Sequence, residues 1–375
     1  MSESARAAIS MNNESEAERE STLGPAADAG FLWDFWYPAL RSRAIRGNEL
    51  ATAMLLEIPL VLGRTKEGRP FAMRDSCPHR GIPLSYGRFD GATLECSYHG
   101  WRFDGCSGRC VEIPSLTSQD KLKVERIFAR HFPCEERDGY VWVYMNLPGT
   151  RVPETIETAP QLKTFSKNYK ITHLACELPS HIDHGIIGLM DPAHGPFVHQ
   201  SWFWRSRKSI HDKEKKFEPI PNGFRMSPHS PSTNSAPYQL LKKMTGAPVT
   251  TTIDFVLPNL RTEEIRSGRY WFSSRAAVTP VRRDLCRIDF VAAWNLPLPV
   301  GIFRMFAKKF LRQDQETMIQ QAEGLKHNPR LMLIDDADRP AKWYFGLKAN
   351  LLESRRNGTP MVHPVDGPVT LHWRS

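Results

Sequence analysis

Two short motifs in the first third of this 375-residue chain each place one cysteine beside one histidine. The first is Cys77-Pro-His79 and the second is Cys96-Ser-Tyr-His99, with 16 residues between His79 and Cys96. Thiolate and imidazole groups are common ligands of transition metals. Zinc fingers usually group like with like, as a pair of cysteines followed by a pair of histidines. The mixed pairs therefore favour a metal centre of another kind.

A two-iron cluster explains why each motif holds one ligand of each type. In a Rieske [2Fe–2S] centre, two thiolates bind one iron and two imidazoles bind the other. Two neighbouring loops can then each give one ligand to each iron. A mixed zinc site and unrelated buried cysteines with surface histidines are the alternatives. We predict that four residues hold a [2Fe–2S] cluster: Cys77, His79, Cys96 and His99.

A second candidate centre follows about one hundred residues later, in the string Asp191-Pro-Ala-His194-Gly-Pro-Phe-Val-His199. Its two imidazoles could point to one metal ion from a helix and the turn after it. With one carboxylate they would form the 2-His-1-carboxylate triad of non-haem Fe(II) oxygenases, which leaves positions open for O2 and substrate. Two histidines at this spacing often have only a structural role. The presence of the two Cys-His motifs in the same chain favours iron ligation by His194 and His199.

The motifs of both candidate centres resemble those of one family, the Rieske non-haem iron oxygenases. Residues 77–84 and 96–103 resemble the Rieske motifs of ring-hydroxylating oxygenase α subunits, and residues 191–199 resemble the D-x2-H-x4-H string of those subunits. Respiratory Rieske proteins differ by an extra cysteine in each loop. The resemblance covers roughly residues 33–350. The single-subunit character favours the monooxygenase and demethylase branch over the two-subunit dioxygenases.

The resemblance also implies a third iron ligand and a catalytic aspartate. Asp314 lies in a segment with helical periodicity and resembles the family's late D-x6-Q helix, with Gln321 as its glutamine. Asp191 is expected to link His194 to the cluster-ligating His99 of another protomer in a homotrimer, and so to conduct electrons. Lesser candidates for the carboxylate ligand are Asp335, Asp336 and Glu316. His181 and His184 do not match the family spacing, and substrate-pocket or packing roles are expected for them.

The function that the resemblance implies is that of a terminal oxygenase component. A reductase or ferredoxin would supply electrons, originally from NAD(P)H, and O2 would be used to hydroxylate or oxidatively demethylate an apolar or aromatic small molecule. Mononuclear Fe(II) and the [2Fe–2S] cluster are the expected cofactors. Monooxygenation and dioxygenation are both left open. The alternatives are an electron-transfer Rieske protein without oxygenase chemistry and a zinc-containing binding module.

The predicted fold class is α+β, with an all-β Rieske domain followed by a catalytic domain in which helices cover an antiparallel sheet. We expect a disordered tail over residues 1–28, the Rieske domain over 29–150 and the catalytic domain over 151–375. Strand pairing is predicted for 58–62 with 70–74. Further expected elements are strands at 139–145, 250–257, 270–278 and 285–294, helical segments at 180–197 and 303–325, a loop at 222–237 and an uninformative tail at 351–375.

Composition narrows the class of protein further. The chain is 41% hydrophobic and 24% charged, and no apolar stretch reaches the ~18 residues of a membrane helix. The N-terminus lacks the apolar core of a secretory signal, so we expect a cytoplasmic protein without a membrane span. Seven cysteines are an odd number and do not suggest a disulfide framework.

The net charge of +9 is not accompanied by a nucleic-acid-binding motif, so no nucleic-acid partner is expected. Basic runs at 205–208, 213–216 and 308–309 are interpreted as solvated faces, with docking of an acidic electron donor as the alternative. An apolar substrate pocket could be lined by aromatic residues, which core packing would explain equally well: Trp202, Phe203, Trp204, Tyr270, Trp271 and Phe303.

Overall fold

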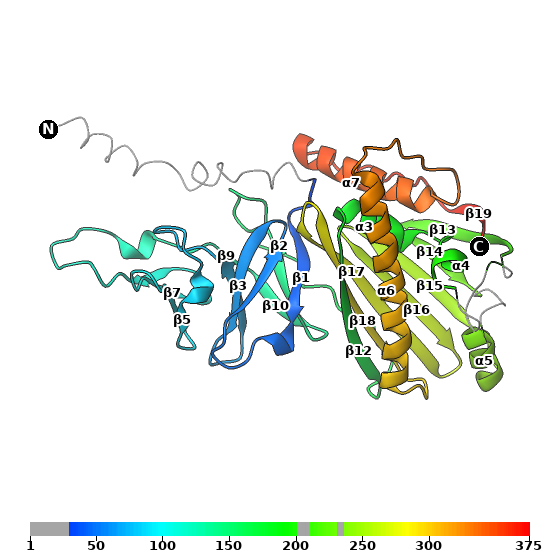
Figure 1. Ribbon diagram of the computed structural model, residues 1–375, viewed down its shortest axis with the longest axis horizontal. Coiled ribbons are helices and arrows are strands. Elements are labelled where there is room, and N and C mark those ends of the chain that lie inside the picture. Colours follow the sequence, from blue (N-terminus) through cyan, green and yellow to red (C-terminus); the bar gives the residue numbers. More distant parts are fainter. Residues whose placement is uncertain (1–29, 201–206, 208–209, 231–235) are drawn as a thin grey trace. The chain divides into compact units, whose positions relative to one another are not determined.

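The structure is a computed structural model in which residue contacts divide the chain after Gln161 into two compact units (Figure 1). It describes residues 30–200, 207, 210–230 and 236–375. The predicted tail at 1–28, the aromatic residues 202–204 and most of the basic run at 205–208 lie outside these residues. The assignment of one role to each predicted domain, with its boundary at residue 150, stays a prediction.

The first unit is built from three small antiparallel sheets. Their strand orders are β1-β11-β10, β2-β3-β4-β9 and β5-β6-β7-β8. The strands are β1 (Phe35–Arg41), β2 (Ala51–Leu55), β3 (Ile58–Arg64), β4 (Pro70–Arg74), β5 (Arg88–Phe89), β6 (Thr93–Glu95), β7 (Arg102–Asp104), β8 (Cys110–Glu112), β9 (His131–Phe132), β10 (Cys134–Arg137) and β11 (Tyr140–Met145). Short 3-10 helices are η1 (Ser42–Ala44), η2 (Leu84–Tyr86) and η3 (Val124–Arg126). The predicted pairing of 58–62 with 70–74 is confirmed.

Strand β11 lies between β1 and β10, and all six of its residues are buried. Its alternation of aromatic and β-branched residues suits a strand that packs on both faces. Separate apolar packing surrounds the sheet formed by β5 to β8, where Phe71, Phe89 and Phe103 are buried together with Cys77 and Cys96. The candidate cluster ligands therefore stand on a packed core.

The second unit is one eight-stranded antiparallel sheet with helices on it. The strand order is β12-β18-β17-β16-β15-β14-β13-β19. The strands are β12 (Lys170–Leu178), β13 (Asp212–Ile220), β14 (Gly223–His229), β15 (Thr250–Val256), β16 (Leu260–Ser267), β17 (Tyr270–Arg282), β18 (Leu285–Trp294) and β19 (Val369–Arg374). The helices are α3 (Ile182–Met190), α4 (Gly195–Val198), α5 (Ala236–Thr245), α6 (Val300–Leu325) and α7 (Arg339–Asn357).

Helix α6 lies along the sheet and packs on β12, while α3 packs on β17 and β18 and also contacts α7 (Figure 1). The predicted helix at 303–325 is therefore present and begins three residues earlier, directly after Pro299. Pro299 is the N-cap, and its missing N–H is one of those that the start of a helix leaves without an intrahelical partner. The predicted fold class, an all-β part followed by a helix-covered antiparallel sheet, is confirmed.

The predicted loop at 222–237 is wrong in its first half, because β14 occupies Gly223–His229 and pairs with β13 and β15. Pro228, one of the residues that suggested a loop, lies where the register with β15 shifts between Met226 and His229. A strand tolerates proline at such an irregularity because no ladder hydrogen bond is required there.

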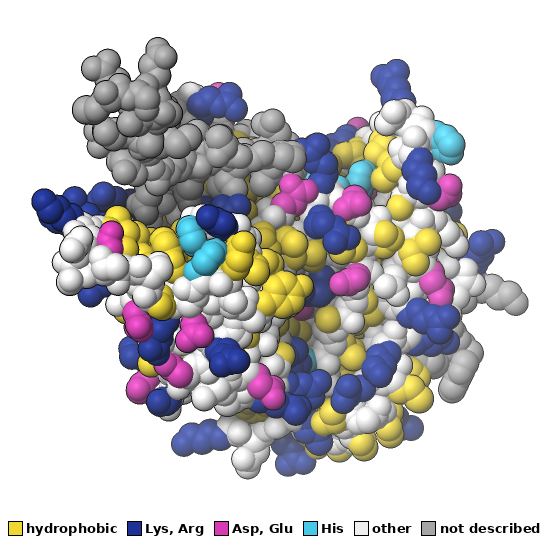
Figure 2. Space-filling model, turned by 60° about the vertical axis from the view of Figure 1, so that its left-hand side comes forward, with side chains coloured by type: hydrophobic (Ala, Val, Ile, Leu, Met, Phe, Trp, Pro, Cys, Tyr) yellow, Lys and Arg dark blue, Asp and Glu magenta, His cyan; other side chains and the backbone are white. Residues whose placement is uncertain are grey.

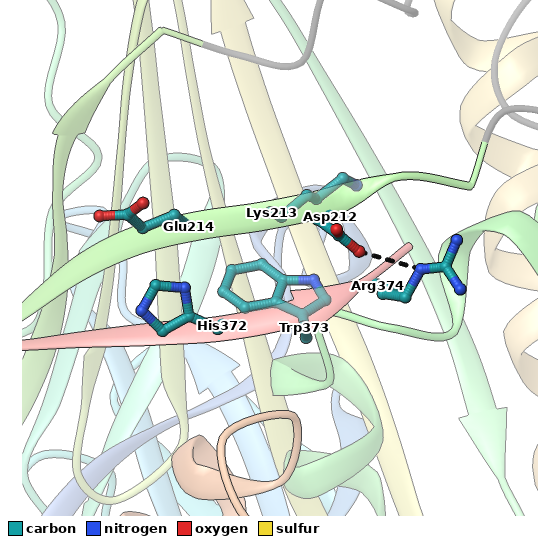
Figure 3. A pocket seen from close by; sticks show the side chains of 6 residues that line it. All are labelled: Asp212, Lys213, Glu214, His372, Trp373 and Arg374. Atoms are coloured by element: carbon teal, nitrogen blue, oxygen red, sulfur yellow. Dashed lines mark ion pairs between the residues drawn. The ribbon is translucent and has the colours of Figure 1, made fainter.

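The description of residues 351–375 as an uninformative tail is wrong. These residues complete α7 and add β19 to the edge of the sheet. Leu371 and Trp373 are buried while their neighbours are exposed, which is the alternation of a strand with one covered face. An open depression of about 430 Å³ lies on this edge. Figure 3 shows the side chains that line it, among them Arg374, which forms an ion pair with Asp212. None of the residues predicted to bind metal lines it.

Within the residues that the structure describes, no helix combines the length and the apolar character needed to cross a membrane. All seven cysteines are free thiols.

Candidate metal sites

The first Cys-His pair lies in the loop that follows β4. The backbone N–H of Cys77 donates to the carbonyl oxygen of Ile82 at 2.8 Å, and the N–H of Gly81 donates back to the carbonyl of Cys77 at 2.8 Å. Gly81 has a φ of 73°, a left-handed conformation that glycine adopts at little steric cost. The loop is thus a tight turn closed on its own cysteine.

The second pair lies in the loop after β6 and repeats the same turn. The N–H of Cys96 donates to Trp101 at 2.8 Å, and the N–H of Gly100 donates to Cys96 at 3.0 Å. Gly100 also has a positive φ of 69°. Two loops of equal geometry can present their cysteine and histidine side chains in equivalent ways, as a cluster with two ligands per iron requires.

The candidate ligand atoms of these loops form a set that fits a [2Fe–2S] cluster. Cys77 and Cys96 are each only 2% exposed. Burial, together with the neighbouring Cys96 thiol, raises the pKa of Cys77 to about 11. The Nδ1 atom of His99 is buried and has no hydrogen-bond partner among the described residues. Burying adjacent thiols and an unpaired ring nitrogen costs free energy of folding. A metal that binds these groups would remove that cost.

Aromatic contacts hold the two imidazoles. The ring of His79 stacks on Trp101 at 4.6 Å between centroids, and the centroid of His99 lies 4.6 Å from that of His79. Tyr98 packs against His99 at 3.9 Å and is half exposed. Figure 2 shows histidine side chains among hydrophobic ones at the surface of the face it presents. His79 and His99 are half-buried, so the histidine side of this site is nearer to solvent than the buried cysteines.

The second site is assembled by α3, α4 and α6. Asp191 ends α3, while His194 and His199 flank the short helix α4. Asp314 belongs to α6. The structure brings together His194, His199 and Asp314, whose candidate ligand atoms all lie within 4.8 Å of one another.

The distances in this group suit three ligands on one side of an ion. Nε2 of His199 lies 3.2 Å from Nε2 of His194 and 3.0 Å from Oδ1 of Asp314. The remaining distance, from Nε2 of His194 to Oδ1 of Asp314, is 4.0 Å. Facial ligands about 2.1 Å from a metal lie about 3 Å apart, so a small closure of the third distance would complete the geometry.

The other ring nitrogen of His194 faces Asp191. Nδ1 lies 2.9 Å from the backbone oxygen of Asp191 and 3.7 Å from its carboxylate Oδ2. The second carboxylate oxygen of Asp191 accepts the N–H of Ala193 at 2.6 Å. Burial alone would lower the pKa of His194, but the hydrogen bond and charge of Asp191, followed by the charge of Asp314, raise it. The carboxylates of Asp191 and Asp314 therefore give the site a negative electrostatic potential, which favours binding of a cation.

His199, which is 7% exposed, is held by one face of α6. Phe310 stacks on its ring at 4.5 Å, Oε1 of Gln313 lies 3.2 Å from its Nδ1, and Asp314 faces its Nε2. Phe310 and Gln313 are not among the predicted site residues. Phe310 lies four residues before Asp314, so helical periodicity places these two side chains on the same face of the helix. Gln313 immediately precedes Asp314.

The weaker candidates lie outside this group. His181 caps the beginning of α3, where its Nδ1 accepts the N–H of Asp183 at 3.2 Å. The lesser carboxylates have other partners among the described residues: Glu316 contacts Arg312, Asp335 contacts Lys342, and Asp336 accepts the N–H of His372.

Comparison with known proteins bears directly on the first site. The model of the Rieske [2Fe-2S] domain matches residues 35–128, a span that contains both Cys-His loops. Chlorophyllide a oxygenase of Chlamydomonas reinhardtii is 36% identical over 176 residues, 46% of this chain. The iron-sulfur subunit TsaM1 of the toluene-4-sulfonate monooxygenase system of Comamonas testosteroni is 28% identical over 280 residues, which cover 64% of this chain and 78% of TsaM1.

The chain is homologous to the Rieske non-haem iron oxygenases. The Chlamydomonas protein is matched over only 25% of its own length, and three further relatives over 30 to 38% of theirs. Pseudomonas putida CBB5 NdmA, solved with caffeine, has a TM-score of 0.69 over 90% of this chain and 96% of its own, at 19% identity. That likeness shows a common fold. Several relatives of this Rieske oxygenase homologue are chloroplast proteins, so the predicted cytoplasmic location stays a prediction.

Proposed function

We propose that this chain is the terminal oxygenase component of a Rieske non-haem iron system. The observation that carries the proposal is the grouping of His194, His199 and Asp314 in a chain that also contains a Rieske [2Fe-2S] domain. A pure electron carrier would need only the Rieske domain. It would have no use for a second donor set of two imidazoles and a carboxylate, which is the set of oxygen-activating ferrous sites.

In this proposal each site residue has a defined task. Cys77, His79, Cys96 and His99 hold the cluster, and His194, His199 and Asp314 hold the ferrous ion. When bound, the cluster and the iron supply one-electron transfer and O2 activation. The protein positions these groups: the closed turns present the cluster ligands, and the oxygen atoms at the Nδ1 positions of His194 and His199 direct each Nε2 towards Asp314.

Asp191 is proposed to connect the two centres across a subunit boundary in a homotrimer, by contact with His99 of the partner subunit. The side chain of Asp191 is about one-third exposed, and its Oδ2 lies 3.7 Å from His194 Nδ1. Its carboxylate can therefore accept a further hydrogen bond while remaining next to the iron ligand. Multi-angle light scattering of the purified protein should give three times the chain mass of 42.8 kDa.

The proposed substrate is an apolar or aromatic small molecule that is hydroxylated or oxidatively demethylated. The printed names of relatives support this class: they include a 3-chlorobenzoate-3,4-dioxygenase subunit, a 4β-methylsterol monooxygenase and NdmA solved with caffeine. Electrons would come from NAD(P)H through a reductase or ferredoxin. A panel of such compounds, with a surrogate reductase, should reveal at least one that couples O2 uptake to an oxidised product identified by mass.

Metal analysis separates this proposal from an electron-transfer Rieske protein. The oxygenase should contain about three irons and two acid-labile sulfides per chain, whereas a carrier should contain two of each. Two irons in protein reconstituted with excess Fe(II), with no O2 uptake on any compound, would exclude the oxygenase. A colourless protein containing zinc would exclude both functions.

A further inference from the structure

We infer that Gln313 is a positioning residue of the ferrous site, which selects the tautomer of His199 that can bind metal. The inference rests on the proposed function, because it concerns how a ligand of the same centre is presented. Gln313 lies immediately before Asp314 on α6, so one turn of helix would provide both a ligand and the group that orients another ligand.

The contact that carries the inference is the 3.2 Å distance from His199 Nδ1 to Oε1 of Gln313. A neutral imidazole has one N–H and one free lone pair. With Gln313 accepting from Nδ1–H, the lone pair is fixed on Nε2. Nε2 is the nitrogen that lies near Nε2 of His194 and Oδ1 of Asp314. The opposite tautomer would place a proton where the metal must bind.

The remaining contacts of His199 prevent the ring from turning away from Gln313. Phe310 stacks on the imidazole at 4.5 Å with an interplanar angle of 29°, and the ring is almost fully buried. Phe310 therefore sets the plane of the ring, whereas Gln313 sets the position of its proton.

His194 is oriented in an equivalent way by a different oxygen. Its Nδ1 lies 2.9 Å from the backbone carbonyl of Asp191. Both histidines thus have an oxygen acceptor at Nδ1 and a free Nε2 directed to Asp314. A neutral amide at His199 supplies the acceptor without adding a third carboxylate to a site that already contains Asp191 and Asp314. The charge of the ferrous ion is then balanced without surplus negative charge nearby.

The test is the affinity of the cluster-loaded full chain for Fe(II), measured anaerobically by competition with a chelator of known affinity. Gln313→Leu keeps the approximate volume but removes the acceptor, and should weaken Fe(II) binding by ~10- to 100-fold, as loss of a ligand-orienting partner typically does. Gln320→Leu is the matched control, since Gln320 is an exposed residue of the same helix. Its Fe(II) affinity should equal that of the wild type.

A second variant separates orientation from general damage to α6. Gln313→Glu keeps an oxygen acceptor and should restore affinity to within a few-fold of the wild type, while the thermal midpoint of the iron-free protein should be equal for Gln313→Leu and Gln320→Leu. Wild-type affinity in Gln313→Leu, or equal losses in Gln313→Leu and Gln313→Glu, would overturn the inference. Wild-type protein that binds no Fe(II) would instead overturn the proposed function.

Discussion

The Nε2 atom of His199 and the Oδ1 atom of Asp314 lie 3.0 Å apart, although more than one hundred residues separate them in the chain. The histidine follows α4, and the aspartate belongs to a helix that packs on β12 at one edge of the sheet. Only the folded sheet with α6 on it brings the two atoms together. Their proximity is the geometric basis of the proposed ferrous centre.

Replacing Asp314 should remove the mononuclear iron and spare the cluster. In Asp314→Ala the two imidazoles lose the carboxylate that completes the triad, so iron should fall from about three to about two per chain. The visible absorbance of the cluster should not change. Iron content and turnover equal to those of the wild type would remove Asp314 from the ligand set.

Replacing Cys96 should have the converse effect. Cys96→Ser removes a buried thiolate ligand, so the protein should lose its acid-labile sulfide and its cluster absorbance. Cys106→Ser is the matched control, because Cys106 is an exposed thiol in the same part of the chain. If the cluster were retained in the Cys96 variant, the assignment of this ligand would be wrong.

The partly buried contact between α3 and α7 should contribute measurably to stability. Asp183 accepts hydrogen bonds from Tyr344 at 2.5 Å and from Lys348 at 2.7 and 2.8 Å. The Lys348 side chain is only 12% exposed, so Asp183→Ala would leave its charge without this partner. We expect a loss of roughly 3 kcal/mol in the free energy of unfolding.

Chemical denaturation of the metal-free protein measures that loss. The double variant Asp183→Ala/Lys348→Met should recover part of the stability. It removes the charge of Lys348 together with the carboxylate that neutralises it. A loss below about 0.5 kcal/mol in the single variant would mean that water replaces the carboxylate at little cost.

His184 gives a pH-dependent contribution of predictable sign. Burial, and then the electrostatic effect of nearby His181, lower the pKa of His184 in the folded state. The unfolded chain therefore binds a proton more readily, so stability is full above the unfolded pKa of about 6.5 and is lost as pH falls towards the folded pKa. His184→Gln should reduce the slope of unfolding free energy against pH between pH 6.5 and 5. An unchanged slope would contradict the assignment.

The sequence predicted the candidate metal ligands better than it predicted the residues that orient those ligands. Cysteine and histidine spacing is local, so the four candidate cluster ligands stood out directly. Asp314 was selected through family resemblance, and only the packing of α6 shows that it reaches His199. The roles of Gln313 and Phe310 were not predicted, because they depend on how α6 is rotated against the histidines.

Two of the strands that the sequence did not predict, β14 and β19, have a related cause. β14 contains Pro228 and few apolar residues in alternation, and β19 lies in a short segment near the end of the sequence. Both exist because partners elsewhere in the chain provide their hydrogen bonds, as β13 does for each of them. Local propensity is a weak guide where pairing with distant strands decides.

Electron paramagnetic resonance of one reduced sample, recorded before and after addition of nitric oxide, tests the presence of both centres most directly. We expect a Rieske-type signal from the reduced cluster and, after nitric oxide, a second high-spin signal from the ferrous centre that is missing in Asp314→Ala. Absence of the Rieske-type signal in protein made with ample iron and sulfide would contradict the account.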